Sequence, residues 1–216
     1  MKDIAIFGAG GFGKEVACLI DLINRSEAEP RWNRVGFFDD NKPVGTDISL
    51  YGKVLGGMSE LNAWPTPLDL AVAIGNPHTI KKVVSLISNP NVSFPNVIHP
   101  NFGMADPRGF SIGQGNIIEG GCFASCDVKI GNFNVLNGSD VLGHDVVVGD
   151  YNVLMPDLRI SGEVEIGRYN LLGVGSIVLQ RVAIGENVVL SPGSVLLRHP
   201  KDNSTYIGNP AKLFKY

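Results

Sequence analysis

Residues 130–148 read IGNFNVLNGSDVLGHDVVV, and this stretch decides the fold of the chain. From Ile130 onward an aliphatic residue returns at every sixth position, and the same phase runs without insertion from Ile112 to Leu196. A period of six belongs neither to an α-helix nor to an ordinary strand. The residues in phase are Ile112, Ile118, Ala124, Ile130, Leu136, Leu142, Val148, Leu154, Ile160, Ile166, Leu172, Val178, Ile184, Leu190 and Leu196.

A second period of eighteen residues lies over the first, because an aliphatic residue followed by glycine recurs once in every three hexads. Three hexads therefore make one turn of a solenoid, whose units stack to bury their apolar edges. The pattern predicts a triangular parallel β-helix of five coils, about 24 Å long at the usual inter-strand spacing. The pairs are Ile112-Gly113, Ile130-Gly131, Val148-Gly149, Ile166-Gly167 and Ile184-Gly185.

Two further positions of each hexad carry expectations. The fourth residue after each in-phase residue is usually small or β-branched, which suits the interior of the prism, as at Asn134, Val146, Val164, Ser176, Val188 and Ser194. The residue directly after the in-phase one is often glycine or asparagine, and we expect it to supply the unusual backbone angles of the corners. These residues are Gly113, Gly131, Asn137, Gly143, Gly149, Gly167, Gly173 and Gly185.

Composition limits the classes of function. The 216 residues are enough for one large or two modest domains, and a net charge of −3 gives no basis for electrostatic binding of nucleic acid. The sequence has neither a signal peptide pattern nor an apolar run of about 20 residues, so we expect a cytoplasmic protein. Its three cysteines are odd in number and lack paired spacing, which predicts neither disulfides nor a zinc site. Cys18 and Cys122 are predicted to be small core residues.

The residues before the hexads predict a small βαβ domain. A buried strand at 3–7 is followed by the glycine loop 8–13 and an amphipathic helix to about Asn24. Further strands are predicted at 35–38 and 70–74, and a helix at about 79–88. Such a loop can bring backbone N–H groups to a phosphate at a helix N-terminus. Tight packing of strand and helix without any ligand explains the glycines equally well.

A carboxylate follows the second of these strands, at Asp39-Asp40, where it can bind the ribose or base of a nucleotide. The domain spans about 95 residues, which is too short for a two-halved dinucleotide fold. An NAD-dependent enzyme is therefore disfavoured.

One corner of the predicted prism differs from the others. Corners eighteen residues apart stack, so His144 is expected to lie between Cys126 and Gly162. Asp145 can hold the histidine tautomer, and histidine can act as a base near neutral pH. A bare amide at Gly162 can stabilise an oxyanion. The alternative is an ordinary surface histidine.

A zinc-dependent carbonic anhydrase of the γ type uses the same scaffold with three histidines. Here His78 belongs to the first domain, and His99 and His199 lie at opposite ends of the prism. The sequence therefore disfavours a metal site.

These motifs together resemble the bacterial hexapeptide-repeat sugar O/N-acyltransferases, of the sialic-acid O-acetyltransferase and nucleotide-4-aminosugar N-acetyltransferase type. The resemblance covers nearly the whole chain and includes the hexads and the segments 8–13, 38–41, 55–56, 73–76, 137–145 and 208–212. It implies an α/β N-terminal βαβ domain, residues 1–98, that binds a nucleotide sugar. It also implies a left-handed parallel β-helix acyltransferase domain, residues 99–216, whose tail flanks CoA.

The resemblance also implies a homotrimer that binds acyl-CoA, such as acetyl-CoA, as a co-substrate between neighbouring subunits. The implied catalytic residues are His144 as general base, Asp145, Asn137 near the acceptor and the Gly162 amide at the thioester carbonyl. The implied acyl-CoA contacts are Val153, Gly162, Val174, Pro192, Gly193, Gly208, Pro210 and Lys212. The implied nucleotide-sugar contacts are Gly8, Gly10, Gly11, Phe12, Asp39, Asp40, Gly56, Gly75 and Asn76. Relatives usually carry histidine at the position of Phe12, and some carry it at the position of Val153, so acceptor or donor choice is expected to differ.

The sequence hypothesis is direct acetyl transfer from acetyl-CoA to a nucleotide-linked 4-amino-4,6-dideoxyhexose in bacterial surface-glycan synthesis. No cysteine has a partnered base, which disfavours an acyl-cysteine intermediate. O-acetylation of a sialic acid or another sugar is the runner-up. Two alternatives from other classes are a non-catalytic trimeric binding or structural module and a nucleotidyltransferase-type regulator.

Overall fold

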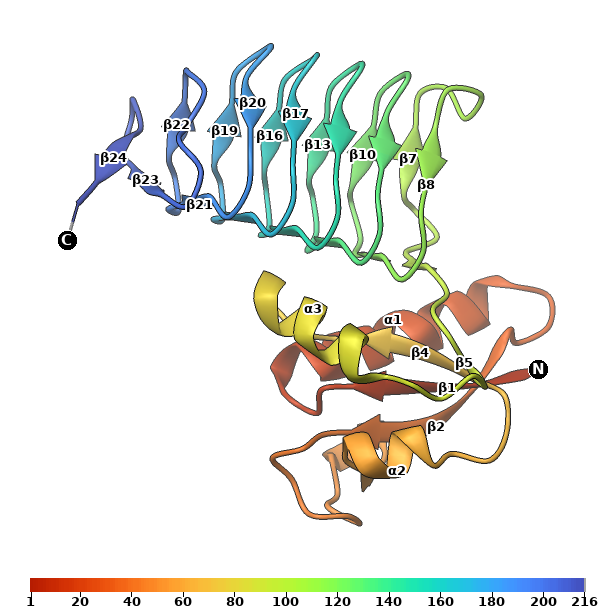
Figure 1. Cartoon of the computed structure of the whole chain (residues 1–216). Coiled ribbons are helices and arrows are strands. Elements are labelled where there is room, and N and C mark those ends of the chain that lie inside the picture. The colour runs from red at the N-terminus through yellow and green to blue at the C-terminus, as the bar shows by residue number, and fades with distance from the viewer. Residues whose placement is uncertain (216) are drawn as a thin grey trace. The chain divides into compact units, whose positions relative to one another are not determined.

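The computed structural model describes residues 1–215 and divides the chain into two units, Met1–Pro100 and Asn101–Tyr216 (Figure 1). The strands of the first unit are β1 (Lys2–Phe7), β2 (Trp32–Phe38), β3 (Val54–Gly56), β4 (Leu68–Val72), β5 (Val92–Ser93) and β6 (Val97–Ile98). Its helices are α1 (Gly11–Ser26), the short 3-10 helix η1 (Ser49–Tyr51), α2 (Met58–Asn62) and α3 (Pro77–Leu86).

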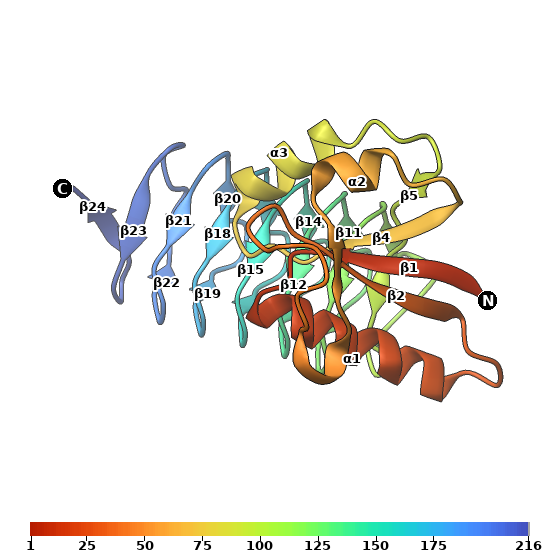
Figure 2. The same ribbon diagram turned by 90° about the horizontal axis from the view of Figure 1, so that it is seen from below.

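Five of these strands form one parallel sheet in the order β3-β2-β1-β4-β5. The chain moves from β1 to β2 on one side and places β4 on the other, so α1 covers one face while α2 and α3 cover the opposite face (Figure 2). The central strand is buried from Ile4 to Phe7. Ligands of such sheets bind at the carboxyl ends of the strands, where the order reverses.

The predicted elements of this unit are present, with small shifts in their ends. The third predicted strand, 70–74, is β4 at Leu68–Val72, and the helix expected at about 79–88 is α3 at Pro77–Leu86. Helix α3 begins early because the Asn76 side chain accepts a hydrogen bond from the Thr79 N–H at 3.0 Å and proline follows as the first helical residue. The short elements β3, β5 and α2 had not been predicted.

The second unit is a parallel β-helix built from two-residue strands on three faces (Figures 1 and 2). The first face holds β7 (Gly103–Met104), β10 (Phe123–Ala124), β13 (Val141–Leu142), β16 (Arg159–Ile160), β19 (Ile177–Val178) and β22 (Val195–Leu196). The second holds β8 (Ser111–Ile112), β11 (Lys129–Ile130), β14 (Val147–Val148), β17 (Glu165–Ile166) and β20 (Ala183–Ile184). The third holds β9 (Ile117–Ile118), β12 (Val135–Leu136), β15 (Val153–Leu154), β18 (Leu171–Leu172), β21 (Val189–Leu190) and β23 (Thr205–Ile207), with β24 (Lys212–Phe214) antiparallel at its end.

The register confirms the eighteen-residue turn, because Leu142 pairs with Ile160 and Ile160 with Val178. Every in-phase residue from Ile118 to Leu196 is buried, and Ile112 in the first coil is partly covered. The six residues expected inside the prism, from Asn134 to Ser194, are fully buried. The hexad pattern thus predicted both the coil and its core.

A ladder of four asparagines lines one interior corner, at Asn116, Asn134, Asn152 and Asn170. The Asn152 side chain shows the pattern: its Oδ1 accepts the Asn170 N–H at 3.0 Å, and its Nδ2 donates to the Gly167 carbonyl at 2.9 Å. Fully buried amides are tolerable only when their polar atoms are satisfied, so the ladder fixes the spacing of successive coils.

The expectation for corner glycines was wrong. Left-handed backbone occurs at the third residue after each in-phase one, for example Asp145 (φ 57°), Tyr151 (φ 58°) and Glu163 (φ 59°), and not at the glycine directly after it. That glycine is needed for space: a Cβ at Gly149 would meet the Gly167 carbonyl of the next coil. The left-handed residues donate their N–H to the preceding coil, as Asp145 does to the Cys126 carbonyl at 3.0 Å. This hydrogen bond offsets the cost of their conformation.

Of the two cysteines predicted to be core residues, one is buried and one is exposed. Cys122 is buried in the β-helix, but Cys18 is exposed on α1 and is not a core residue. Helix α1 places only one face on the sheet, and its buried side chains include Val16, Leu19 and Ile20, so position 18 falls on the outer face. Among residues 1–215, no helix is long and apolar enough to cross a membrane.

Candidate active site

His144 lies at the corner that follows β13. Its Nδ1 is 2.8 Å from Oδ2 of Asp145, and a carboxylate only accepts hydrogen bonds, so Nδ1 is the donor. This leaves Nε2 of the neutral ring as a proton acceptor. The His144 side chain is 48% exposed, so a ligand can reach it. Asp145 itself has left-handed backbone, with φ 57°.

Gly162 lies directly against this ring, one coil along. A Cβ at position 162 would lie 2.6 Å from Cε1 and 2.8 Å from Cδ2 of His144, and closer still to Nε2. Only glycine therefore leaves room for the imidazole. Within residues 1–215, no backbone carbonyl accepts the Gly162 N–H, whereas the next amide, Glu163, donates to the His144 carbonyl at 2.8 Å. The stack of His144 over Gly162 that the period predicted is present, and Gly162 itself is buried beneath the ring.

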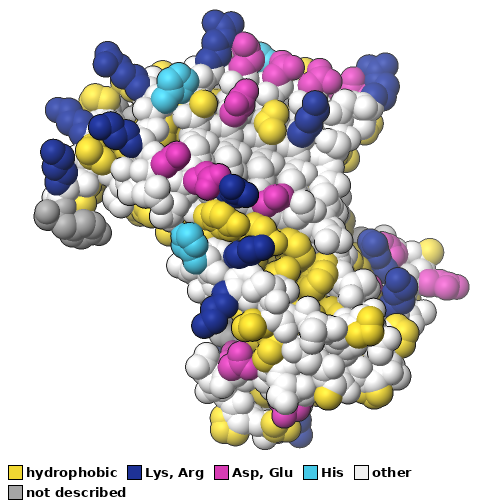
Figure 3. All heavy atoms as spheres, viewed as in Figure 1, with side chains coloured by type: hydrophobic (Ala, Val, Ile, Leu, Met, Phe, Trp, Pro, Cys, Tyr) yellow, Lys and Arg dark blue, Asp and Glu magenta, His cyan; other side chains and the backbone are white. Residues whose placement is uncertain are grey.

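Acidic side chains flank the histidine along this edge. The left-handed residues of three consecutive coils are Asp127, Asp145 and Glu163, and Figure 3 shows acidic side chains in a row along one edge of the β-helix. Glu163 is paired with Arg181 of the next coil, with Nε to Oε2 at 3.0 Å. The hydrogen bond from Arg181 is the main reason that the pKa of Glu163 lies below its usual value.

Other predicted residues lie at a different corner of the same prism. Asn137 follows β12, and Val174, Pro192 and Gly193 follow later strands of the same face. Val174 is 45% exposed, as suits a surface contact. Strand β13 separates Asn137 from His144, so one chain places them at two corners rather than in one site.

Val153 and the chain's tail complete the predicted acyl-CoA set. Val153 is buried, with 1% exposure, so its side chain does not reach the surface of this chain. Gly208 donates its N–H to Ser194 Oγ at 3.0 Å. Pro210 and Lys212 line a cavity of about 440 Å³.

Arg198 and His199 also line the tail cavity, although the sequence had not suggested them. The Nδ1 atom of His199 accepts the Ala183 N–H at 2.8 Å. Three basic side chains, those of Arg198, His199 and Lys212, thus share the cavity and can face an anion.

The first unit holds a cavity of about 420 Å³ at the carboxyl ends of β1, β2 and β4. Three predicted residues line it, Gly8, Asp39 and Asp40. Asp39 organises the loops: its Oδ2 accepts the Ala9 N–H at 2.8 Å and its Oδ1 the Asn41 N–H at 2.9 Å. Asp40 Oδ1 accepts the Met58 N–H at 2.7 Å. Asp39 therefore positions the glycine loop as well as lining the cavity.

Helix α3 supplies Thr79 and Lys82 to this cavity, and the sequence analysis missed both. Their spacing of three residues puts them on one face of the helix that follows β4, which is a signal that could have been read. A lysine at this edge can face the phosphates of a bound nucleotide.

The remaining predicted contacts lie outside the lining of the cavity. Gly11 begins α1, which has no side-chain cap, and a Cβ at Gly10 or Gly11 would have open space. Gly56 packs against Glu60, and Asn76 caps α3. Phe12 and Gly75 also lie outside that lining.

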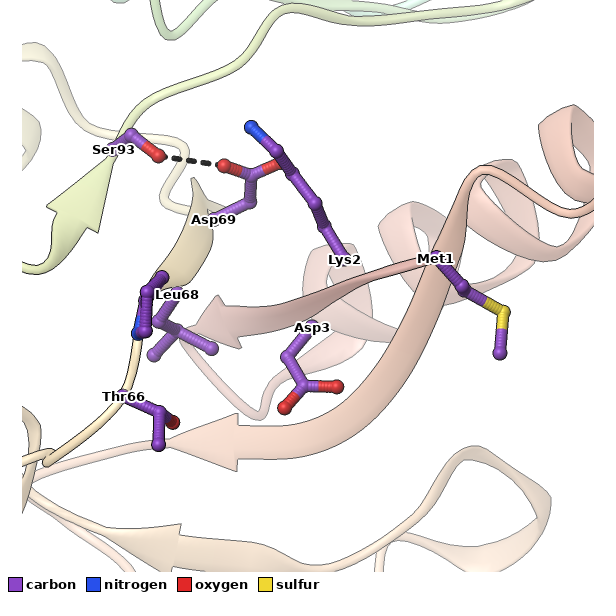
Figure 4. A pocket seen from close by; sticks show the side chains of 8 residues that line it. Met1, Lys2, Asp3, Thr66, Leu68, Asp69 and Ser93 are labelled. Atoms are coloured by element: carbon purple, nitrogen blue, oxygen red, sulfur yellow. Dashed lines mark hydrogen bonds between the residues drawn. The ribbon is translucent and has the colours of Figure 1, made fainter.

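A second cavity of the first unit, about 330 Å³, lies at the opposite edge of the sheet, where Lys2 and Leu68 begin β1 and β4 (Figure 4). Its buried carboxylate, Asp69, accepts Trp32 Nε1–H at 2.8 Å and Ser93 Oγ–H at 2.6 Å. The carboxylate is therefore engaged in holding strands together, in contrast to the open cavity at the carboxyl ends. Among residues 1–215, no group of three or more His, Cys, Asp or Glu side chains could hold a metal ion.

Asp140 is the one fully buried carboxylate of the β-helix among the described residues. Its Oδ1 accepts the Leu158 N–H at 2.9 Å, as the ladder asparagines accept from the next coil, while its Oδ2 has no hydrogen-bond partner within residues 1–215. Burial raises the pKa of Asp140 to about 8. Burial, together with the nearby Asp140, raises the pKa of the Cys122 thiol to about 11, so Cys122 is not a reactive thiolate.

The chain thus combines an α/β domain with a hexad β-helix. Residues 3–87 match the family of PglD N-terminal domains. The acetyltransferase domain of PglB from Neisseria gonorrhoeae, solved with acetyl coenzyme A, has a TM-score of 0.86 and 26% identity over 99% of each chain. A mutant of perosamine N-acetyltransferase from Caulobacter crescentus, solved with CoA and GDP-perosamine, has a TM-score of 0.87 and 25% identity over 100% of this chain and 98% of its own.

WeeI from Acinetobacter baumannii has a TM-score of 0.85 and 25% identity over 99% of this chain and 100% of its own. A search of curated proteins found no match. Over nearly its whole length the chain is thus similar to solved bacterial acetyltransferases.

Proposed function

We propose that this chain transfers the acetyl group of acetyl-CoA to the amino group of a nucleotide-linked 4-amino-4,6-dideoxyhexose. The observation that carries the proposal is the His144–Asp145 pair packed on the bare backbone of Gly162. The likeness to an N-acetyltransferase solved with CoA and GDP-perosamine supports an amino sugar as acceptor.

The reaction follows from the atoms at this corner. His144 Nε2 takes a proton from the acceptor nitrogen as that nitrogen attacks the thioester carbonyl carbon. The Gly162 N–H donates to the oxyanion that forms. Asp145 holds the ring in the required tautomer and stabilises the imidazolium. The intermediate then collapses: the C–S bond breaks, the amide remains on the sugar, and the proton passes from His144 to the departing thiolate of CoA.

The tail cavity and the cavity of the α/β domain suit the two substrates. Arg198, His199 and Lys212 can bind the phosphates of CoA, and Lys212 acts as a point charge. Asp40 and Lys82 can bind the base and the phosphates of the nucleotide sugar. Each cavity thus has basic side chains that can bind the phosphates of its substrate, and the cavity of the α/β domain also has the carboxylate of Asp40 for the base.

The active form in this proposal is a homotrimer. Asn137, Val174 and the Pro192-Gly193 turn lie at one corner of the prism, and His144 with Gly162 lies at another. Packing β-helices side by side would bring the first corner of one copy to the second corner of its neighbour. Such an assembly completes three equivalent sites by symmetry.

The test assays the full chain with acetyl-CoA and UDP-, dTDP- and GDP-linked 4-amino sugars, with free sialic acid as a comparison. We expect turnover with a nucleotide amino sugar, and a kcat lowered by about 10²–10⁴ in His144→Ala. Arg168→Ala, at another corner, is the matched control and should retain activity. Thermal shift with CoA and with the nucleotide should show stabilisation by both.

Three results would overturn parts of the proposal. Turnover of sialic acid alone would replace it with O-acetylation. Stabilisation by neither ligand would indicate a structural module. A loss of less than threefold in His144→Ala would remove His144 as the base.

A further inference from the structure

Glu163 lies beside the base and is held by two side chains of the next coil. Its Oε1 accepts hydrogen bonds from Gln180 Nε2 at 2.8 Å and from Arg181 Nη2 at 3.1 Å. Its Oε2 accepts from Arg181 Nε at 3.0 Å. The guanidinium thus grips both oxygens in the fork geometry that gives the strongest pairing with a carboxylate.

This clamp lies near the histidine in space, because Glu163 belongs to the next coil of the β-helix. Glu163 follows Gly162, on which the His144 ring packs, and its N–H donates to the His144 carbonyl at 2.8 Å. The positive charge that His144 acquires would also lower the pKa of Glu163, so the two side chains interact electrostatically. His144 is therefore flanked by one carboxylate that it pairs with, Asp145, and by a second that is turned away.

We propose that Glu163 is a positioning residue for the general base. Arg181 and Gln180 hold its carboxylate toward the next coil, so that His144 pairs with Asp145 alone. The inference rests on the proposed function, because it takes His144 as the base. Without the clamp, the free carboxylate competes for the imidazole and favours its protonated form, in which it cannot accept a proton.

The charged side chains around His144 determine the direction in which each substitution shifts the pH dependence of the reaction. Asp145 shares its coil, Cys126 and Asp127 belong to the preceding coil, and Glu163 to the next. Removing Arg181 adds an uncompensated negative charge beside the base. Removing the charge of Glu163 leaves an uncompensated guanidinium. The two substitutions must therefore move the pH dependence of the reaction in opposite directions.

The experiment measures kcat/KM for the nucleotide amino sugar against pH, at about 50 mM and about 1 M salt. For Arg181→Ala we expect the acid-side midpoint to rise by roughly 0.3–1 pH unit at low salt, and for Glu163→Gln to fall by a similar amount. The double variant should return close to the wild-type midpoint. Each shift should shrink at 1 M salt, where charges are screened within about 3 Å.

Arg168→Ala is the matched control, because Arg168 Nε pairs with Glu186 Oε1 at 2.7 Å between successive coils at another corner. Its loss should leave the midpoint unchanged and lower the melting temperature about as much as Arg181→Ala does. The acceptor is the same throughout, so its own amine contributes equally to every profile. Shifts of the same sign, or shifts no larger than that of the control, would overturn the inference.

The His144→Ala variant distinguishes a failure of the proposed base from a failure of the role of Glu163. If His144→Ala is inactive while all midpoints coincide, only the role of Glu163 fails. If His144→Ala retains activity within threefold of wild type, the proposed base fails, and the role of Glu163 fails with it.

Discussion

Two corners of the same prism are built on opposite principles. The asparagine corner repeats one residue type through four coils, and each amide satisfies the next. The histidine corner repeats nothing: Cys126, His144, Gly162 and Gln180 follow one another at the same register position. Repetition stabilises the stack, while its interruption places one base above one bare amide. The scaffold and the chemistry therefore respond to different substitutions.

Asn152→Ala should give the largest loss of stability at the asparagine corner. It removes the partner of the Gly167 carbonyl and of the Asn170 N–H, both in the buried ladder. Unsatisfied buried groups cost about 1–3 kcal/mol each, so we expect a loss of about 3–5 kcal/mol in the free energy of unfolding. Denaturant unfolding measures it. The kcat of the folded protein should stay within about twofold; a hundredfold loss would show that the two corners are coupled.

Gly162→Ala should reverse this pattern at the histidine corner. The added Cβ would overlap the His144 ring, so the ring must move off its position above the amide. Loss of one oxyanion donor's geometry costs about 10²–10³ in kcat. Steady-state kinetics measures it, with the melting temperature as the check on folding. Unchanged kcat would show that the ring does not act from this position.

Asp140 lies at a third interior corner. It occupies the position within its hexad that asparagine occupies in the ladder. The carboxyl keeps its proton in the folded state up to about pH 8, whereas the unfolded chain loses it near the ordinary value of 3.8. Between these values the folded state binds one more proton, so stability falls as pH rises.

Asp140→Asn should remove this dependence on pH. We expect little difference from wild type below about pH 4 and a gain of about 2–4 kcal/mol in the free energy of unfolding above pH 8. Denaturant unfolding at pH 4, 6, 8 and 9 measures it. Parallel curves for the two proteins would mean that Asp140 is ionised in the folded state.

The sequence predicted the features that depend only on the six-residue period of the hexads. An unbroken period of six places His144 over Gly162 without knowledge of any side-chain contact. The left-handed positions could not be predicted from glycine, because Tyr151, Glu163 and Arg181 adopt them with hydrogen bonds to the preceding coil as compensation. The spacing of Thr79 and Lys82 places both on one face of α3, but which face lines the cavity depends on the rotation of the helix about its axis. Asn137 and His144 lie at separate corners because each coil is triangular in cross-section. A comparison of sequence motifs does not show this separation.

The smallest effect is expected at the outer side of the asparagine corner, where Phe133, Tyr151 and Tyr169 stack. Ring centroids lie 5.4 Å apart for Phe133 and Tyr151, and 5.6 Å apart for Tyr151 and Tyr169. Tyr151→Asn removes both stacks, worth about 0.5–1.5 kcal/mol each, but asparagine tolerates the left-handed backbone better than tyrosine does. We therefore expect a net loss of about 1 kcal/mol, measured by denaturant unfolding.

Tyr151 and Asp145 occupy the same position in consecutive hexads, and both have left-handed backbone. Tyr151→Asn should leave kcat unchanged, because the aromatic stack belongs to the repeating corner. A loss of activity beyond about threefold, with the melting temperature nearly unchanged, would mean that this corner also contacts a substrate. Retained activity would show that the reaction does not require the aromatic stack outside the asparagine corner.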